Sequence, residues 1–198
     1  MCAQDNMLVA QPSTPASYFH LLREHTYTRP RRPLIVFTPK QLLRLKAACS
    51  PVEDFTSGTF KPVIGETDDA VLASAQKQGV DRVLLCSGRV YYDLLAHRTK
   101  TGDTSTAIVR LEQLYPLQTQ DIAEALAPFS GAELVWVQDE PANQGMWPYL
   151  ALHLPTDLTG GVLPTLVSRP EAAAPAVGTA GVHRAQQEEI LRQAFARH

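Results

Sequence analysis

From residue 82 to its end, the sequence alternates between short apolar runs and longer amphipathic stretches. The apolar runs predict strands at 82–86, 107–110, 134–138 and 161–167. The stretches between and after them predict helices near 90–98, 119–128, 144–152 and 182–196. Regular alternation of this kind is typical of α/β proteins, in which helices cover a mainly parallel sheet. We therefore expect an α/β domain over residues 79–198.

A helix between two strands is also indicated near the start of the chain. Thr14 followed by Pro15 is a typical helix start, because threonine caps the first turn and proline suits its first position. We expect this helix to run from about 15 to 25 and to turn one face inward. Spacings of three and four residues place on that face Tyr18, Leu21, Leu22 and His25, with His20 at its border.

The apolar run at 33–37 lies between prolines and has the pattern of a strand covered on both faces in a parallel sheet. A short helix is expected near 41–48. After it, glycine, proline and aspartate recur without a clear period, as is typical of a connection between domains. The sequence therefore predicts three parts, at 1–50, 51–78 and 79–198.

Composition makes several classes of protein improbable. The 198 residues carry 18 basic and 20 acidic side chains, so nothing in the net charge of −2 favours nucleic acid or an anionic membrane as a partner. No apolar stretch of about 18 residues is present. Three cysteines without metal-ligand spacing indicate reduced thiols in an intracellular protein. The histidines have no spacing that predicts a bound metal.

Three peptides carry a family resemblance. Residues 17–23 read SYFHLLR, residues 32–40 read RPLIVFTPK, and residues 139–148 read DEPANQGMWP. Together they resemble the C-terminal region of the thiamine diphosphate-dependent first component of 2-oxoglutarate dehydrogenase. The chain is also similar to the actinobacterial multifunctional 2-oxoglutarate decarboxylase, and the resemblance covers nearly its whole length.

The resemblance implies both a fold and a reaction. Residues 1–50 would end a transketolase-like pyrimidine-binding domain, and 79–198 would form a transketolase C-terminal-like domain. The complete enzyme would decarboxylate 2-oxoglutarate oxidatively in the tricarboxylic acid cycle and pass a succinyl group to a lipoyl-bearing succinyltransferase component. A homodimer, or association with the remainder of the enzyme, is implied, in the cytoplasm of a bacterium or the mitochondrial matrix of a eukaryote. The sequence does not separate 2-oxoglutarate from 2-oxoadipate.

The chain alone is not expected to be active. The family binds thiamine diphosphate and Mg²⁺ through a Gly-Asp-Gly loop that precedes this region, and no such tripeptide occurs here. The cofactor would therefore be bound mainly by residues outside this chain. The first seven residues resemble the family segment before the histidine-containing helix, so Met1 fits an internal methionine.

His20 is the candidate catalytic and cofactor-contacting residue. The family motif places a histidine at this point of the helix, near thiamine diphosphate and its substrate adduct. A neutral imidazole can accept or donate a proton near pH 7. Spacing alone would favour a structural histidine, whereas the flanking motifs favour the catalytic role.

Asp139 stands where the family has a glutamate, directly after a predicted buried strand. The C-terminal edge of an open α/β sheet is where ligand-binding loops gather. One interpretation gives the stretch 139–145 a role at a subunit interface or substrate channel. The other makes it a helix start with Asn143 as the cap.

A regulatory site for acetyl-CoA is a further implication of the resemblance to actinobacterial members. The turn at Ser87, Gly88 and Arg89 could present amides and a guanidinium to an anion. Pro170 stands where the regulated relatives carry a second arginine, which weakens the match. The rival hypothesis is a non-catalytic module that senses acetyl-CoA or a nucleotide, or that supplies a subunit interface. The motif match assigns the acetyl-CoA site to Thr38, Arg89, Tyr92, Ser168 and Arg169.

Overall fold

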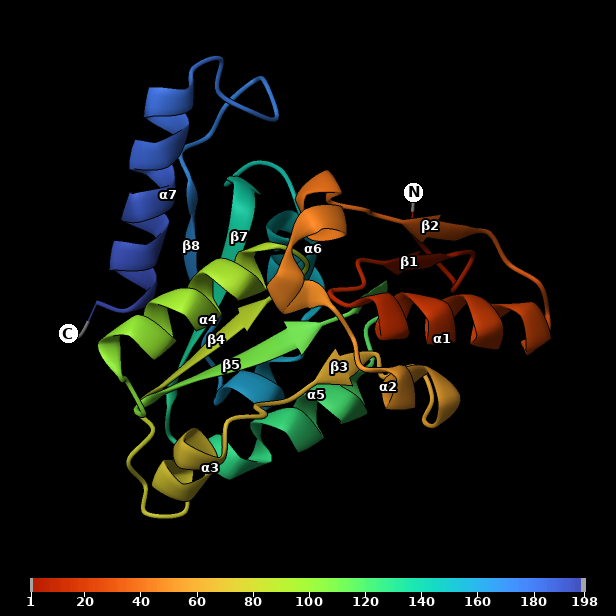
Figure 1. Cartoon of the computed structure of the whole chain (residues 1–198), viewed down its shortest axis with the longest axis horizontal. Coiled ribbons are helices and arrows are strands. Elements are labelled where there is room, and N and C mark those ends of the chain that lie inside the picture. The colour runs from red at the N-terminus through yellow and green to blue at the C-terminus, as the bar shows by residue number, and fades with distance from the viewer. Residues whose placement is uncertain (1, 197–198) are drawn as a thin grey trace.

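A computed structural model describes residues 2–196 and contains two β-sheets that lie side by side (Figure 1). The smaller sheet has the strand order β2-β1-β6, with β1 parallel to β2 and antiparallel to β6. Its strands are β1 (Leu8–Ala10), β2 (Leu34–Val36) and β6 (Gln113–Tyr115). Two of these strands come from the start of the chain, and the third comes from its middle.

The larger sheet has the strand order β3-β5-β4-β7-β8 and is mainly parallel, as predicted. Only β3 runs antiparallel, at its edge beside β5. The strands are β3 (Val63–Ile64), β4 (Arg82–Cys86), β5 (Thr106–Leu111), β7 (Glu133–Pro141) and β8 (Thr165–Arg169). The chain is therefore an α/β protein with mixed sheets.

Helices connect and cover these strands. The α-helices of the described residues are α1 (Pro15–Tyr27), α2 (Val52–Thr56), α3 (Asp69–Ala75), α4 (Val90–Thr101), α5 (Thr119–Leu126), α6 (Trp147–His153) and α7 (Ala180–Ala194). Short 3-10 helices occur at η1 (Lys40–Arg44), η2 (Lys46–Ala48), η3 (Ala127–Phe129) and η4 (Thr156–Thr159). Within residues 2–196, no helix combines the length and apolar character needed to cross a membrane.

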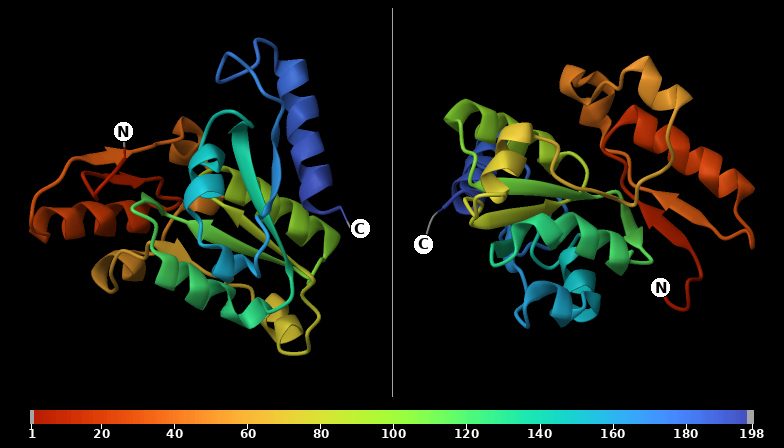
Figure 2. Two further views of the ribbon diagram at one scale, coloured as in Figure 1. Left: turned by 180° about the vertical axis from the view of Figure 1, so that it is seen from behind. Right: turned by 90° about the horizontal axis from the view of Figure 1, so that it is seen from below.

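The five-stranded sheet is covered on both faces, as the view from below in Figure 2 shows. Successive side chains of a strand point to opposite faces. Leu84 therefore packs with α4 and α7, while Leu85 packs with α3, α5 and α6. All five residues of β4 are buried, which explains why the sequence shows a continuous apolar run there rather than an alternating pattern. Cys86 lies in this core, and burial raises the pKa of its thiol.

Most predicted elements are present, but two boundaries are wrong for reasons of turn geometry. The strand predicted at 161–167 begins only at Thr165, because Gly160 and Gly161 form a turn with φ of 66° and 87°. The helix predicted from 144 begins at Trp147, because Gly145 adopts a φ of 69° in the turn before it. Such backbone conformations favour glycine and end regular structure.

The predicted inward face of α1 is partly wrong. The helix begins as expected, with the Thr14 hydroxyl accepting from the backbone N–H of Ser17 at 3.1 Å. Leu21 is buried, but Tyr18 and Leu22 are 37% and 45% exposed. Besides Leu21, the buried residues of α1 are Ala16 and His20. His20 can be buried because its ring has a hydrogen-bond acceptor there, the backbone carbonyl of Asp54.

The strand predicted at 33–37 is also more open than its sequence suggests. In β2 the middle residue, Ile35, is 45% exposed, and β2 is an edge strand of the three-stranded sheet. A proline-bounded apolar run is equally compatible with an edge strand and a central one, because proline is tolerated at sheet edges. Coverage on both faces is therefore not observed within the described residues.

The two sheets are joined at a single buried glutamate, Glu112, which lies between β5 and β6. Its carboxylate is fully buried and accepts hydrogen bonds from the Ser13 backbone N–H and the Ser17 hydroxyl, both at 2.7 Å. Its backbone carbonyl accepts from the N–H of Gln11, and its N–H donates to the carbonyl of Pro62, both at 2.8 Å. Glu112 therefore ties the start of α1 to the point where the chain crosses from one sheet to the other.

Ser13 is bound at every polar atom it has. Besides its N–H, its carbonyl accepts from the Tyr92 hydroxyl at 2.7 Å, and its hydroxyl accepts from the Arg110 guanidinium at 3.0 Å. The same guanidinium lies 4.0 Å from the centre of the Tyr91 ring, a cation–π contact. The junction between the sheets is thus polar and buried, and its hydrogen bonds leave only Glu112 Oε1 and Arg110 Nε as buried side-chain atoms without a partner among the described residues.

We predict that Glu112→Ala destabilises the protein by about 3–5 kcal/mol, because the Ser13 N–H and the Ser17 hydroxyl lose a charged acceptor in a buried site. Urea unfolding followed by circular dichroism would measure the change. Glu189→Ala is the matched control, since Glu189 pairs with Arg192 at the surface of α7 and its loss should change little. Equal effects of the two substitutions would contradict the importance of the junction.

Candidate functional site

His20 lies at a small cavity between α1 and α2. Its side chain is only 5% exposed, and its Nε2 atom lies 2.7 Å from the backbone carbonyl oxygen of Asp54. The cavity measures about 300 Å³. Its walls are formed by Thr14, Ala16, Ser17, His20, Asp54, Ser57, Gly58, Thr59, Lys61 and Ile64.

Aromatic packing fixes α2 against α1. The Phe19 ring lies edge-on to the His20 ring with centroids 5.1 Å apart, and Phe55 lies edge-on to Phe19 at 5.8 Å. Edge-to-face geometry at these distances is favourable. Because Phe55 follows Asp54 directly, this packing also places the carbonyl that the histidine contacts.

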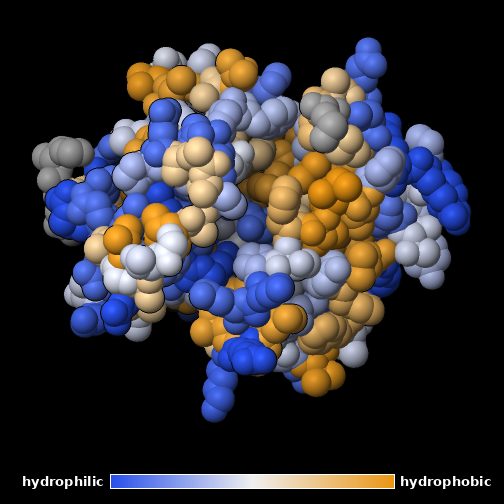
Figure 3. All heavy atoms as spheres, turned by 90° about the horizontal axis from the view of Figure 1, so that it is seen from above, coloured by the Kyte–Doolittle hydropathy of each residue, from blue (hydrophilic) through white to orange (hydrophobic). Residues whose placement is uncertain are grey.

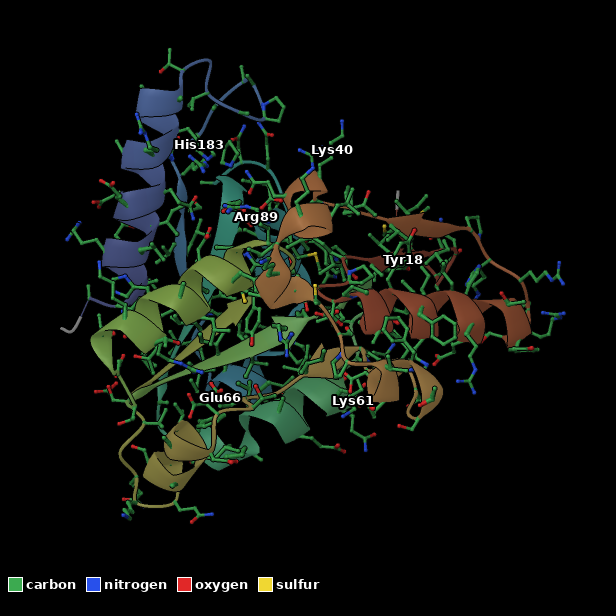
Figure 4. All side chains as sticks on the ribbon, viewed as in Figure 1. Tyr18, Lys40, Lys61, Glu66, Arg89 and His183 are labelled. Carbon is green, nitrogen blue, oxygen red and sulfur yellow. The ribbon has the colours of Figure 1, made fainter. Side chains whose placement is uncertain are left out.

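The wall of the cavity is polar. Ser17 lines it and at the same time donates its hydroxyl proton to Glu112, which connects the cavity to the junction between the sheets. Lys61 is the basic residue of the wall, and Figure 4 shows it close to α2. Among residues 2–196, no group of three or more histidine, cysteine or acidic side chains could hold a metal ion.

A second cavity, of about 360 Å³, lies on the other side of α1 beneath η1 and is mainly apolar. Tyr18, Thr38, Leu42 and Cys49 are among the residues that line it. Figure 4 marks Tyr18, which lines this cavity from α1, and Lys40 at the start of η1, whose later residues Leu42, Leu43 and Arg44 also line it. Figure 3 shows a hydrophobic area in the middle of the face seen from above, between the end with α7 and the far end of α1.

Arg89 and Arg169 belong to a closed ring of hydrogen bonds at the carboxyl edge of the larger sheet. Arg89 donates to the Asp139 carboxylate through Nε and Nη2, at 3.0 and 2.9 Å, and pairs with Asp93 at 2.7 Å. Arg169 donates to the Asp139 carbonyl at 2.6 Å and to Gln187 at 2.9 Å. Gln187 donates to Asp93 at 2.9 Å and closes the ring. Both guanidinium groups therefore have internal partners.

The residues assigned to acetyl-CoA line different cavities or take part in different hydrogen bonds. Thr38 lines the apolar cavity beneath η1, and the hydroxyl of Tyr92 is bound to Ser13 at the junction. Ser168 and Arg169 line a groove of about 540 Å³ that α7 residues also line. Arg89 is linked to Arg169 only through the ring. An anion at Arg89 would have to displace Asp139 or Asp93.

The stretch 139–145 is not a helix start, whereas its role at a subunit interface or substrate channel stays a prediction. Asp139 belongs to β7 itself, and its shorter side chain still reaches Arg89 with two hydrogen bonds. Asn143 is not a helix cap, because α6 begins four residues later, at Trp147, and its cap position is Met146. Its side chain instead exchanges two hydrogen bonds of 3.1 Å with the backbone of Ala172. Asn143 therefore fixes the segment that follows β8.

Gln138 organises this stretch and was not identified from the sequence. It is 3% exposed, and its Oε1 accepts from the indole N–H of Trp136 at 2.9 Å and from the backbone of Trp147 at 3.0 Å. Its amide donates to the carbonyl of Gln144 at 2.8 Å. A Cβ atom on Gly145 would come within 3.0 Å of this side chain. The sign of this residue in the sequence is a glutamine at the end of the apolar run 134–138.

Burial raises the pKa values of two carboxyl groups near the ring. Desolvation is the main cause for both Asp93 and Glu140, and the neighbouring charge of Asp139 acts in the same direction. Arg89 opposes the shift at each residue. A raised pKa means that the folded protein binds the proton more tightly than the unfolded chain does, so stability falls as pH rises through that window.

We predict that Glu140→Gln stabilises the protein at neutral pH, because the amide removes the cost of burying a charge. The gain should shrink as pH falls through the raised pKa toward the ordinary glutamate value near 4.3, where the wild-type carboxyl becomes neutral. Urea unfolding at pH 7 and pH 4 would measure it. Lys61→Gln is a control for loss of an exposed charge. An equal gain in stability from Glu140→Gln at both pH values would refute the prediction.

Comparisons with known proteins agree with the resemblance seen in the motifs. The profile of the 2-oxoglutarate dehydrogenase C-terminal family matches residues 49–195. A relative named 2-oxoglutarate dehydrogenase E1/E2 component, from Corynebacterium glutamicum, is 46% identical over 197 residues, which is 98% of this chain and 16% of the relative.

Two further relatives carry related names. A multifunctional 2-oxoglutarate metabolism enzyme from a Mycobacterium species is 46% identical over 201 residues, covering 98% of this chain and 15% of the relative. A 2-oxoglutarate dehydrogenase E1 component from Cupriavidus necator is 43% identical over 198 residues, covering 100% of this chain and 20% of the relative. The chain thus spans between 15% and 20% of the length of these relatives.

Proposed function

Because this chain belongs to the 2-oxoglutarate dehydrogenase C-terminal family, we propose that it works as the C-terminal region of a thiamine diphosphate-dependent first component that decarboxylates 2-oxoglutarate. The observation that carries the proposal is the placement of His20 at a polar cavity, on the helix whose motif resembles the family. The names of the relatives support the same substrate.

In this proposal His20 accepts or donates a proton at the reacting centre, while α1 and α2 hold its ring. Thiamine diphosphate, when bound, supplies the electron sink for decarboxylation. Mg²⁺ and the diphosphate would be held mainly by residues outside this chain. Ser17 keeps its hydroxyl proton directed at Glu112, which leaves its oxygen lone pairs free to accept a hydrogen bond from the cavity.

We also propose that the smaller sheet and α1 end a pyrimidine-binding domain, with boundaries at 1–50, 51–78 and 79–198. The start of the family match at residue 49 supports this division. Strand pairing links the three parts, because β6 of the last part pairs with β1 of the first, and β3 of the connection pairs with β5 of the last. The larger α/β part would hold the subunit interface and shape access for the lipoyl arm of the succinyltransferase component.

The test is a chimera in which this chain replaces the segment that it matches in the Cupriavidus necator relative. We expect the chimera to decarboxylate 2-oxoglutarate, and His20→Ala to lower the rate by about 10²-fold or more. His25→Ala is the matched control, because His25 lies on the same helix but does not line the cavity.

The outcomes separate the alternatives. A folded but inactive chimera would count against the proposed function, provided that the parent enzyme is active in the same assay. An active chimera whose His20→Ala variant keeps its rate would reduce His20 to a packing residue.

Acetyl-CoA sensing is a second candidate function, favoured by the convergence of Arg89 and Arg169 on Asp139. If Arg89 binds a phosphate of acetyl-CoA, Asp139 competes with the ligand for the guanidinium. We predict that Asp139→Asn tightens acetyl-CoA binding and that Arg89→Met weakens it by about tenfold or more, since a charged hydrogen bond contributes about 1.5–3 kcal/mol.

Isothermal titration calorimetry of the chain with acetyl-CoA would measure both changes. Arg192→Met is the control for loss of an exposed arginine, because Arg192 pairs only with Glu189 on α7 among the ion pairs of the described residues. Weaker binding by the Asp139 variant would exclude a competition of this kind.

A further inference from the structure

The hydrogen bond between His20 and Asp54 shows which nitrogen of the His20 ring carries a proton. The Nε2 atom lies 2.7 Å from the backbone carbonyl oxygen of Asp54, a short distance for a hydrogen bond between nitrogen and oxygen. A carbonyl oxygen has lone pairs and no proton, so it can only accept. The proton in this contact therefore resides on Nε2.

A neutral imidazole carries one proton, and the other nitrogen then has a free lone pair. With Nε2 protonated, the lone pair of His20 is on Nδ1. Within the described chain, Nδ1 makes no hydrogen bond with another protein atom, whereas Nε2 makes one. The two nitrogens thus have different surroundings.

The ring is held in this orientation by its neighbours. Turning it over would exchange Nε2 for a carbon atom at the Asp54 carbonyl and lose the hydrogen bond in a nearly buried site. The edge of Phe19 packs on the ring, and Phe55 packs on Phe19. Gly58, which has a φ of 101°, also lies near the ring. A Cβ atom on Gly58 would be 4.0 Å from Nε2 of His20.

We propose that Asp54, through its backbone carbonyl, positions His20 as the tautomer protonated on Nε2, so that Nδ1 alone exchanges protons in the cavity. The catalytic meaning of this assignment rests on the proposed function, whereas the tautomer itself does not. Asp54 is in this sense a positioning residue, and its side chain is not involved.

The proton balance of the step is simple. When the neutral ring accepts a proton from the reacting group, a bond forms between Nδ1 and that proton, and the donor keeps the electron pair. The ring becomes a cation with both nitrogens protonated, and Nε2 keeps its bond to the Asp54 carbonyl. That bond strengthens when its donor is charged. Returning the proton from Nδ1 restores the starting tautomer.

Nitrogen NMR of the chain, labelled with ¹⁵N-histidine, tests the tautomer directly. At about pH 8, above the ordinary histidine pKa of about 6.5, His20 should show a protonated Nε2 and an unprotonated Nδ1. His20→Gln removes the signal and so assigns it. A proton on Nδ1, or averaged shifts from two tautomers, would overturn the proposal.

Two amide variants provide an independent test. The amide nitrogen of glutamine lies near the position of Nε2, and that of asparagine lies near Nδ1. His20→Gln should therefore keep the contact with Asp54 and unfold near the wild-type urea concentration, whereas His20→Asn should unfold at a lower one. Equal losses of stability would refute the assignment of Nε2 as the anchored nitrogen.

Activity separates this proposal from the proposed function. In the active chimera, both amide variants should lose about 10²-fold in rate, because neither amide transfers a proton near neutral pH. A normal rate for His20→Gln would show that no proton passes through Nδ1 and would overturn the catalytic part. An inactive chimera with the Nε2 tautomer intact would count against the proposed function alone.

Discussion

The carboxylate of Glu112 is the interaction on which the arrangement of this molecule depends. It is fully buried between two sheets and holds the Ser13 N–H and the Ser17 hydroxyl. A buried charge is tolerable only when hydrogen bonds replace its hydration. Those hydrogen bonds come from the start of α1, so the helix that carries His20 is placed by the strand crossing and not by its own apolar contacts alone.

The same dependence explains the character of the His20 cavity. Ser17 contributes to its wall and to the junction at once, and α2 reaches the cavity through the packing of Phe55 on Phe19. The site is thus assembled from the N-terminal helix, the connecting segment and, through Glu112, the larger sheet. Disturbance of any of the three would move the histidine.

The sequence predicts the larger sheet well because its signal is local. All five residues of β4 are buried, and β4, β5 and β7 each contain a predicted apolar run, although β5 and β7 extend beyond theirs, over Thr106–Leu111 and Glu133–Pro141. The two-residue β3 and three-residue β6 are too short to produce a pattern, and β6 is defined by its partner β1. The division into domains at residues 50 and 79 stays a prediction.

The sequence indicates residues of the candidate site only where a motif contains them. His20 followed from its flanking peptide, and its cavity could not have been foreseen because the Asp54 carbonyl is a backbone atom that any residue would supply. Gln138 and Glu112 gave no periodic signal, since buried polar residues are recognised only from their partners. Asn143 was predicted as a helix cap from its position, but a distant backbone at Ala172 offered better partners.

The strand β6 has a consequence for the order in which the protein can fold during synthesis. The hydrogen bond from Ser13 to Glu112 spans 99 residues of sequence, and β6 follows immediately. The smaller sheet therefore lacks its third strand, and α1 lacks its anchor, until the ribosome has released Glu112 and β6. Contacts between distant residues slow folding and leave apolar surface exposed in the meantime. The segment that carries β1 and α1 is thus made before its partner strand β6 and can be completed only after β6 is present.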